Sequence, residues 1–166
     1  MSVIRAANQH DVPAVLRMIH ELADYEKEPD AVRNTPEMLQ EVLFGPDPRV
    51  FAAIAENAAG QVQGFALWFL NYSTWEGVHG IYLEDLYVSP AARGEGHGKA
   101  LLQHLAGIAL ANGYARVEWS VLDWNEPSIN FYRSLGARPM DGWSTFRLTG
   151  AALTQFGTAV PAAVNG

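Results

Sequence analysis

Residues 81–99, IYLEDLYVSPAARGEGHGK, decide how the rest of the chain is interpreted. Their first half alternates apolar and β-branched residues as a strand does, but Glu84 and Asp85 interrupt the alternation with charge. Their second half holds three glycines between residues 94 and 98 and runs into an apolar helical segment. Because glycine leaves the backbone bare, several free N–H groups can converge on an anion at the helix start. The stretch therefore predicts an anion site beside a polar centre.

The size of the chain fits one domain with a full core, since it has 166 residues and 49% hydrophobic content. We expect this domain to span residues 1–156 and to be followed by a poorly ordered tail over residues 157–166. No apolar run approaches the roughly 18 residues that a membrane helix requires, and the first residues lack the layout of a signal peptide. We therefore expect a cytoplasmic protein that does not enter a membrane.

Charge and cysteine content narrow the chemistry. The formal charge of −7 disfavours non-specific nucleic-acid binding and favours a cationic small substrate. The absence of cysteine excludes disulfides, thiolate metal sites and an acyl-cysteine intermediate. His97 and His104 do not form an HExxH arrangement, so we expect no metal site.

The order of the expected elements indicates an α/β protein. Asn8 and Asp11 form a variant of the capping box before the first helix. The expected strands are residues 2–6, 50–56, 61–70, 81–88, 115–122 and 143–148, and the expected helices are residues 12–23, 35–44, 98–112 and 126–135. This order predicts a mixed sheet with helices on both faces.

Three kinds of phosphate site compete for residues 93–99, RGEGHGK. The dinucleotide fingerprint requires G-x-G-x-x-G after a first strand, whereas these glycines are spaced G-x-G-x-G after the fourth. The Walker pattern requires four residues between its first glycine and Gly-Lys, followed by Ser or Thr. Here three residues separate Gly94 from Gly98-Lys99, and Ala100 follows. A merely flexible turn does not explain why Arg93 and Lys99 flank the glycines. The third kind of phosphate site is identified by the family resemblance that these residues share in.

Four motifs support a family resemblance. Residues 93–98 match R/Q-x-x-G-x-G/A, the loop that binds the diphosphate of acyl-coenzyme A in a family of acetyltransferases. Residues 125–137, NEPSINFYRSLGA, resemble the later coenzyme-binding helix of the same family. With YLED at 82–85 and STW-x-G at 73–77, residues 2–149 resemble the diamine (spermidine/spermine) and thialysine branch of the Gcn5-related N-acetyltransferases (GNAT). The resemblance implies the GNAT fold, α/β (α+β), with about four helices on both faces of a mixed, mostly antiparallel sheet. About six or seven strands are expected, with a splayed, bulged fourth strand.

The resemblance also implies acetyl-CoA as co-substrate, without a metal. The implied coenzyme-binding residues are Leu86, Tyr87, Val88, Arg93, Gly94, Glu95, Gly96, His97, Gly98, Lys99, Asn125, Ser128 and Tyr132. Among them, backbone N–H groups of the fourth strand would polarise the thioester carbonyl, which requires the strand to bulge away from its neighbour.

The chemistry of amine acetylation sets two further requirements. A lysine-like amine with a pKa near 10.4 is protonated at pH 7, and deprotonating it costs about 4.6 kcal/mol. The resemblance assigns this proton transfer to Glu84, and it assigns protonation of the departing thiolate to Tyr132. Because no cysteine is available, direct attack in a ternary complex is expected.

The acceptor stays open at this point. The resemblance implies that the amine contacts Tyr25, Glu26, Trp75, Glu84, Asp85 and Asp141. Ser73 stands where polyamine acetyltransferases carry an aspartate, and the loop is similar to that of the thialysine enzymes. A thialysine or lysine-like amino acid, a diamine and a polyamine are all candidates. The alternatives are a peptide or aminoglycoside-type acetyltransferase and a non-catalytic CoA sensor. The family resemblance further implies a homodimer.

Overall fold

The computed structural model describes residues 1–158 and divides them between two compact units. The first unit is Met1–Asp123, and the second starts at Trp124. No helix among residues 1–158 is both long enough and apolar enough to span a bilayer.

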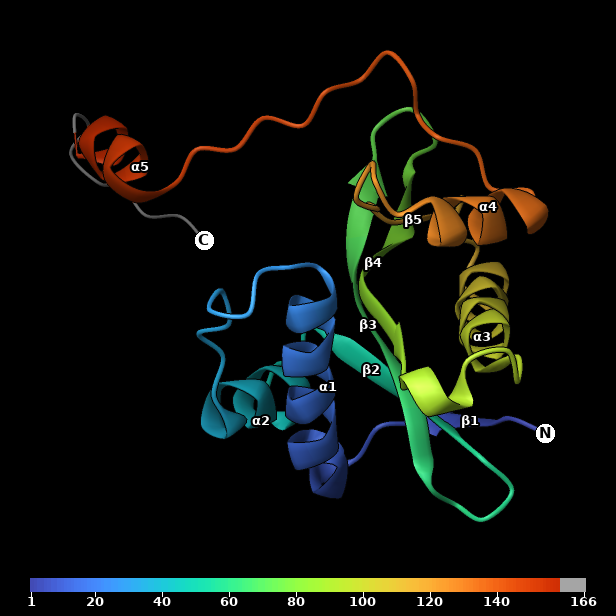
Figure 1. The fold of residues 1–166 in the computed structure, drawn as a ribbon. Coiled ribbons are helices and arrows are strands. Elements are labelled where there is room, and N and C mark those ends of the chain that lie inside the picture. The colour runs from blue at the N-terminus through green and yellow to red at the C-terminus, as the bar shows by residue number, and fades with distance from the viewer. Residues whose placement is uncertain (159–166) are drawn as a thin grey trace. The chain divides into compact units, whose positions relative to one another are not determined.

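A five-stranded sheet organises the first unit, in the order β1-β2-β3-β4-β5 (Figure 1). The first four strands pair antiparallel, and β5 is parallel to β4. Their bounds are Val3–Ala6 for β1, Phe51–Glu56 for β2, Val62–Ser73 for β3, Val78–Val88 for β4 and Val117–Glu118 for β5. The hairpin predicted between β2 and β3 is confirmed, and the side chain of Asn57 accepts N–H bonds within its turn.

Helices cover both faces of this sheet, as predicted. The helices α1, Val12–Tyr25, and α2, Pro36–Phe44, lie on one face, and α3, His97–Ala111, lies on the other (Figure 1). Two short 3-10 helices, Gln9–Asp11 and Pro90–Ala92, precede α1 and α3. The capping box predicted from Asn8 and Asp11 is present in full. Thr35 caps α2 by accepting the N–H of Met38 at 3.2 Å.

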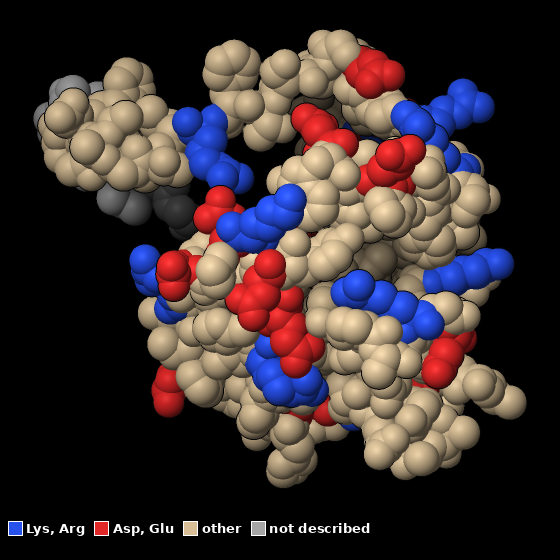
Figure 2. All heavy atoms as spheres, viewed as in Figure 1, with Lys and Arg blue, Asp and Glu red and all other residues tan. Residues whose placement is uncertain are grey.

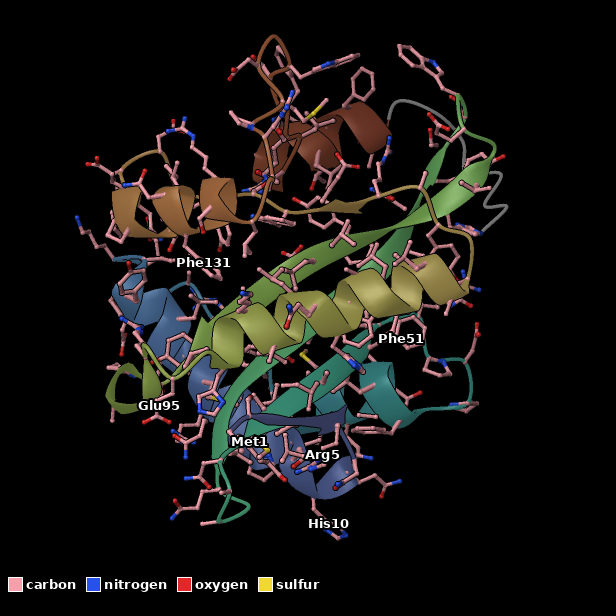
Figure 3. All side chains as sticks on the ribbon, turned by 90° about the vertical axis from the view of Figure 1, so that its right-hand side faces the viewer. Met1, Arg5, His10, Phe51, Glu95 and Phe131 are labelled. Carbon is pink, nitrogen blue, oxygen red and sulfur yellow. The ribbon has the colours of Figure 1, made fainter. Side chains whose placement is uncertain are left out.

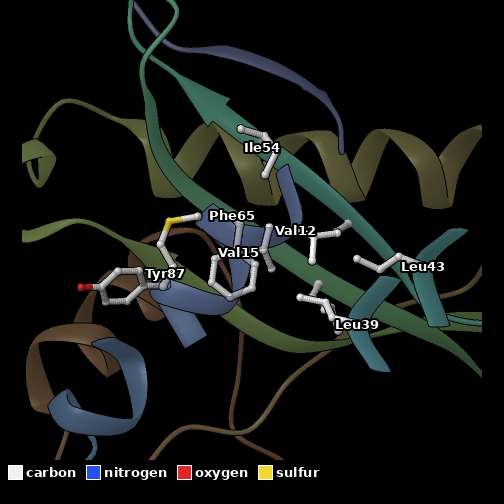
Figure 4. Packing of buried hydrophobic residues seen from close by; sticks show 10 residues of the cluster. Val12, Val15, Leu39, Leu43, Ile54, Phe65 and Tyr87 are labelled. Atoms are coloured by element: carbon white, nitrogen blue, oxygen red, sulfur yellow. The ribbon is translucent and has the colours of Figure 1, made fainter. Parts of the chain in front are cut away.

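The hydrophobic core lies between the sheet and the first two helices (Figure 4). Val15 and Met18 of α1 pack there with Phe65 of β3 and Tyr87 of β4, because the apolar stripe of α1 faces the sheet. The presence of Tyr87 in this core identifies the face of β4 that looks toward α1.

The second unit holds two helices in its described part, α4, Glu126–Ser134, and α5, Gly150–Gly157. The helix α5 was not predicted from the sequence. Most of the tail predicted over residues 157–166 lies outside the described residues, and the prediction of one domain over residues 1–156 stays a prediction.

The expected count of six or seven strands is wrong, because the sheet formed by residues 1–158 has five. Residues 143–148 alternate as a strand would, but within residues 1–158 they pair with no other strand and lie in irregular structure. A strand exists only where a neighbour satisfies its N–H and C=O groups. For the same reason the strand predicted over residues 115–122 shrinks to the two residues of β5 that pair with β4.

Candidate active site

A β-bulge in β4 places Glu84 and Asp85 on the same face of the sheet. The register pairs Leu67 with Asp85 and Trp68 with Leu83, so Glu84 is the extra residue. Side chains alternate between the two faces on either side of this point. After the bulge, Asp85 lies on the same face as Tyr87, which packs in the core against α1. Before the bulge the alternation is shifted by one residue, so Glu84 also lies on this face. Both carboxylates therefore lie on the face that looks toward α1.

The same strand has an open edge toward β5. The strands β4 and β5 pair only at Ile81 and Tyr82, and the register continues no further. At the end of β4 the N–H of Ser89 donates to the carbonyl of Gln63 at 2.8 Å, on the β3 side. Since backbone N–H groups alternate in direction along a strand, those of Leu86 and Val88 point away from β3, toward the open edge. The splayed fourth strand predicted from the sequence is therefore confirmed.

The glycine loop forms a bare cradle at the start of α3. Gly94 and Gly96 have φ values of +87° and +88°, which L side chains rarely adopt, and nothing lies within 4 Å of where their Cβ atoms would be. The first intrahelical hydrogen bond of α3 is donated by Ala100 to Gly96 at 2.9 Å. The N–H groups of the preceding helical residues, His97, Gly98 and Lys99, therefore remain available to an anion at the positive end of the helix.

The side chain of His97 does not belong to this cradle. It is 2% exposed, with Nδ1 2.7 Å from the hydroxyl of Ser2 and Nε2 3.2 Å from a carboxylate oxygen of Glu95. Figure 3 shows Glu95 and Met1 near the start of α3. The imidazole therefore ties the loop to the residue before β1, and only the backbone of His97 can contribute to a coenzyme site. Among residues 1–158, no cluster of His, Cys, Asp and Glu could hold a metal ion.

Arg93, at the start of the loop, contacts two aromatic rings. Its guanidinium carbon lies 5.1 Å from the ring centroid of Tyr25, the last residue of α1, and 5.8 Å from that of Tyr87. Its Nε donates to the carbonyl of Val88 at 3.1 Å. A residue predicted to bind the coenzyme thus touches one predicted to contact the amine.

Three carboxylates gather between the end of α1 and the bulge of β4. Burial raises the pKa of Asp85 to about 6, and the charges of Glu84 and Glu26 add to the effect. Burial, and then the charge of Glu84, also raises the pKa of Glu26. Glu26 caps the C-terminal end of α1, where the helix dipole disfavours a negative charge. Such an arrangement costs stability, and a bound cation would offset the cost.

Trp75 is not brought to this cluster within the chain. It is 90% exposed in the turn between β3 and β4, whereas Asp85 pairs with Leu67 about six residues down the hairpin, roughly 20 Å away. Ser73 is buried, and its hydroxyl accepts the N–H of Glu76 at 3.1 Å, so its side chain shapes the turn. Over the face in Figure 2, acidic and basic side chains are interspersed on the first unit.

The other predicted residues belong to the second unit. Asn125 is the N-cap of α4, and its side chain accepts the N–H of Ser128 at 3.4 Å. Tyr132 lies one turn beyond Ser128 on the same face of the helix, with its ring 5.6 Å from that of Phe131. Asp141 is exposed in the turn that follows. Their roles toward coenzyme and amine stay predictions.

The comparisons with known proteins agree with this geometry. A family model described as "Acetyltransferase (GNAT) family" matches residues 15–137. A thialysine N-epsilon-acetyltransferase of Sus scrofa is 40% identical over 163 residues, covering 92% of this chain and 95% of that protein. A spermidine/spermine N(1)-acetyltransferase-like protein of Homo sapiens is 37% identical over 87% of this chain and 22% of its own length.

Among solved structures, an integron cassette protein from the mobile metagenome of V. cholerae superimposes with a TM-score of 0.78. It is 26% identical, and the match covers 94% of this chain and 97% of that one.

Proposed function

Since the chain belongs to the GNAT family of acetyltransferases and is an N-acetyltransferase, we propose that it transfers acetyl directly from acetyl-CoA to a small primary amine. The proposed acceptor is a thialysine or lysine-like amino acid, or a diamine. The observation that carries this proposal is the position of the carboxylates of Glu84 and Asp85, on the strand whose open edge presents the N–H groups of Leu86 and Val88.

The residues present fit acetyl-CoA. The N–H groups at the start of α3 and the guanidinium of Arg93 suit a diphosphate, and the free edge of β4 suits an extended amide-containing arm that pairs as a short strand. When bound, the thioester supplies an activated acetyl group. The N–H groups of Leu86 and Val88 are the proposed donors to its carbonyl oxygen, where losing one such donor typically costs about 3 kcal/mol.

The acidic group serves the acceptor. In this proposal Glu26 and Asp85 hold the incoming ammonium, and Glu84 accepts the proton that the amine must lose, directly or through water. The proposed acid that protonates the departing thiolate is Tyr132, the role that the family resemblance implies for it. A sulfur atom in the acceptor side chain lowers the basicity of its amine, which reduces the cost of deprotonation and favours a thialysine-like acceptor.

The test of these roles is the turnover of Glu84→Gln, with Glu76→Gln in the exposed hairpin turn as the control. If Glu84 is the base, kcat falls by about 10² or more in Glu84→Gln, whereas the control keeps wild-type turnover. Equal turnover in the two variants would remove Glu84 from the mechanism. Initial-rate patterns should intersect, since parallel reciprocal lines would indicate a covalent acetyl-enzyme instead of direct transfer.

The proposal includes a homodimer. Large apolar side chains are exposed on residues 140–156, namely Met140, Trp143, Phe146, Leu148, Leu153 and Phe156. So many exposed apolar residues mark a surface that another protein surface covers. Sedimentation of the wild type should give twice the monomer mass, and Phe146→Asp should lower it to that of the monomer. A monomeric wild type would refute this part of the proposal.

A further inference from the structure

The guanidinium of Arg93 is held by three groups that come from two elements, α1 and β4. Tyr25 comes from α1, Tyr87 from β4, and the carbonyl of Val88 accepts from Nε at 3.1 Å. Both ring distances lie within the roughly 6 Å at which a cation is attracted to an aromatic face. These contacts restrain the guanidinium before any ligand arrives.

These contacts do not use the two Nη groups of Arg93 as hydrogen-bond donors. Within residues 1–158 they meet no hydrogen-bond acceptor, whereas Nε is occupied by Val88. A guanidinium binds phosphate through paired N–H groups in a fixed fork. Arg93 immediately precedes Gly94 in the sequence, so it stands next to the bare amides of the loop, which form a site suited to an anion.

The two rings differ in what holds them. Tyr87 is 5% exposed in the core, and burial, followed by the nearby side chain of Glu21 of α1, raises the pKa of its hydroxyl. The Tyr87 ring is therefore part of the core, and removing it would disturb the fold. Tyr25 ends α1 and is more exposed, so its ring can be removed at smaller cost to the core.

We propose that Tyr25 is a positioning residue for the phosphates of the coenzyme, because its ring contacts the Arg93 guanidinium while the Nη groups are left to bind an anion at the neighbouring glycine loop. The amine contact expected for Tyr25 from the sequence is the alternative that the experiment must distinguish from this role. The inference rests on the proposed function, since it requires CoA as the ligand. One helix end then serves both substrates, through Tyr25 for the coenzyme and through Glu26 for the amine.

Calorimetric binding of CoA tests the inference without relying on turnover. Tyr25→Leu should weaken binding by roughly threefold to fivefold, whereas Tyr25→Phe, which keeps the ring, should bind like the wild type. In an Arg93→Met background, Tyr25→Leu should cause no further loss, since the two residues act as one unit. Tyr72→Leu removes an exposed ring that packs on His79 near the far end of the hairpin and is the matched control. Thermal melts confirm that each variant is folded.

A truncated donor separates positioning from amine contact. With acetyl-pantetheine, which lacks the phosphates, Tyr25→Leu should acetylate the amine at the wild-type rate, and the KM for the amine should not change. The inference is overturned if the Tyr25 variants raise the amine KM equally with both donors, or if Tyr25→Leu binds CoA as tightly as the wild type. A wild type that binds no CoA would refute the proposed function itself.

Discussion

Replacing Asp85 by Asn should make the protein more stable and less active. Its carboxyl has a pKa of about 6 in the folded state, against an ordinary value of 3.8, chiefly because it is buried and also because Glu84 and Glu26 are close. The difference of about two units corresponds to about 3 kcal/mol. At pH 7 the folded protein bears this cost of an ionised Asp85, and the neutral amide of Asn removes it.

The sign of the pH dependence follows from the direction of the shift. The folded state binds the Asp85 proton more tightly than the unfolded chain, so this group lowers the free energy of unfolding as the pH rises from about 4 to about 6. Below that window Asp85 is protonated in both states. The gain in Asp85→Asn should therefore be about 3 kcal/mol at pH 7.5 and below about 1 kcal/mol at pH 4.

Urea denaturation at both pH values measures this difference, with the exposed loop variant Asp30→Asn as the control. Acetyl transfer should fall in Asp85→Asn, because the ammonium loses a charged partner, while Asp30→Asn keeps both its activity and its stability. Opposite changes in stability and turnover are expected of a residue retained for function. The reasoning is refuted if Asp85→Asn is no more stable than the wild type at pH 7.5, or if its gain is the same at pH 4.

Two other substitutions test the glycine loop and the capping box before α1. Gly96→Ala forces an L side chain to a φ of +88°, so CoA binding measured by calorimetry should weaken at least about tenfold. The control is Gly107→Ala inside α3, where a Cβ meets nothing within 4 Å, and this variant should bind CoA like the wild type. Asp11→Asn should lose about 2 kcal/mol in chemical denaturation, because Asp11 accepts two hydrogen bonds from Arg5 at 2.7 and 2.8 Å and completes the capping box. A hydrogen bond from Arg5 holds the pKa of Asp11 below its ordinary value, so the wild type should lose this stabilisation as the pH falls through that depressed pKa. Equal losses of stability in acid for the wild type and Asp11→Asn would contradict the assignment.

The glycine loop and β4 could be predicted because their signals are local. The spacing of Gly94, Gly96 and Gly98 prescribes a bare backbone before a helix, and the charge pair Glu84 and Asp85 interrupts a strand pattern at the bulge. These features depend on residues adjacent in sequence. The structure accordingly has the cradle and the splayed strand where the sequence predicts them.

Features that depend on partners far along the chain could not be predicted. Residues 143–148 alternate as a strand does, yet a strand needs a neighbour, and alternation says nothing about whether one is present. The stack of Arg93 on Tyr25 joins residues 68 positions apart, and the burial of His97 depends on Ser2. The amine contact that the family resemblance implies for Tyr25 stays a prediction, and the contact with Arg93 supports the proposed role toward the coenzyme.

Release of free thiol from acetyl-CoA tests the central claim most directly. The wild type should be assayed with thialysine, lysine, putrescine, spermidine, a lysine-containing peptide and an aminoglycoside. The proposed function predicts thiol release with the small primary amines, fastest with thialysine, and matching formation of the acetylated amine. Thiol release with the peptide or the aminoglycoside alone, or CoA binding without thiol release on any amine, would contradict it.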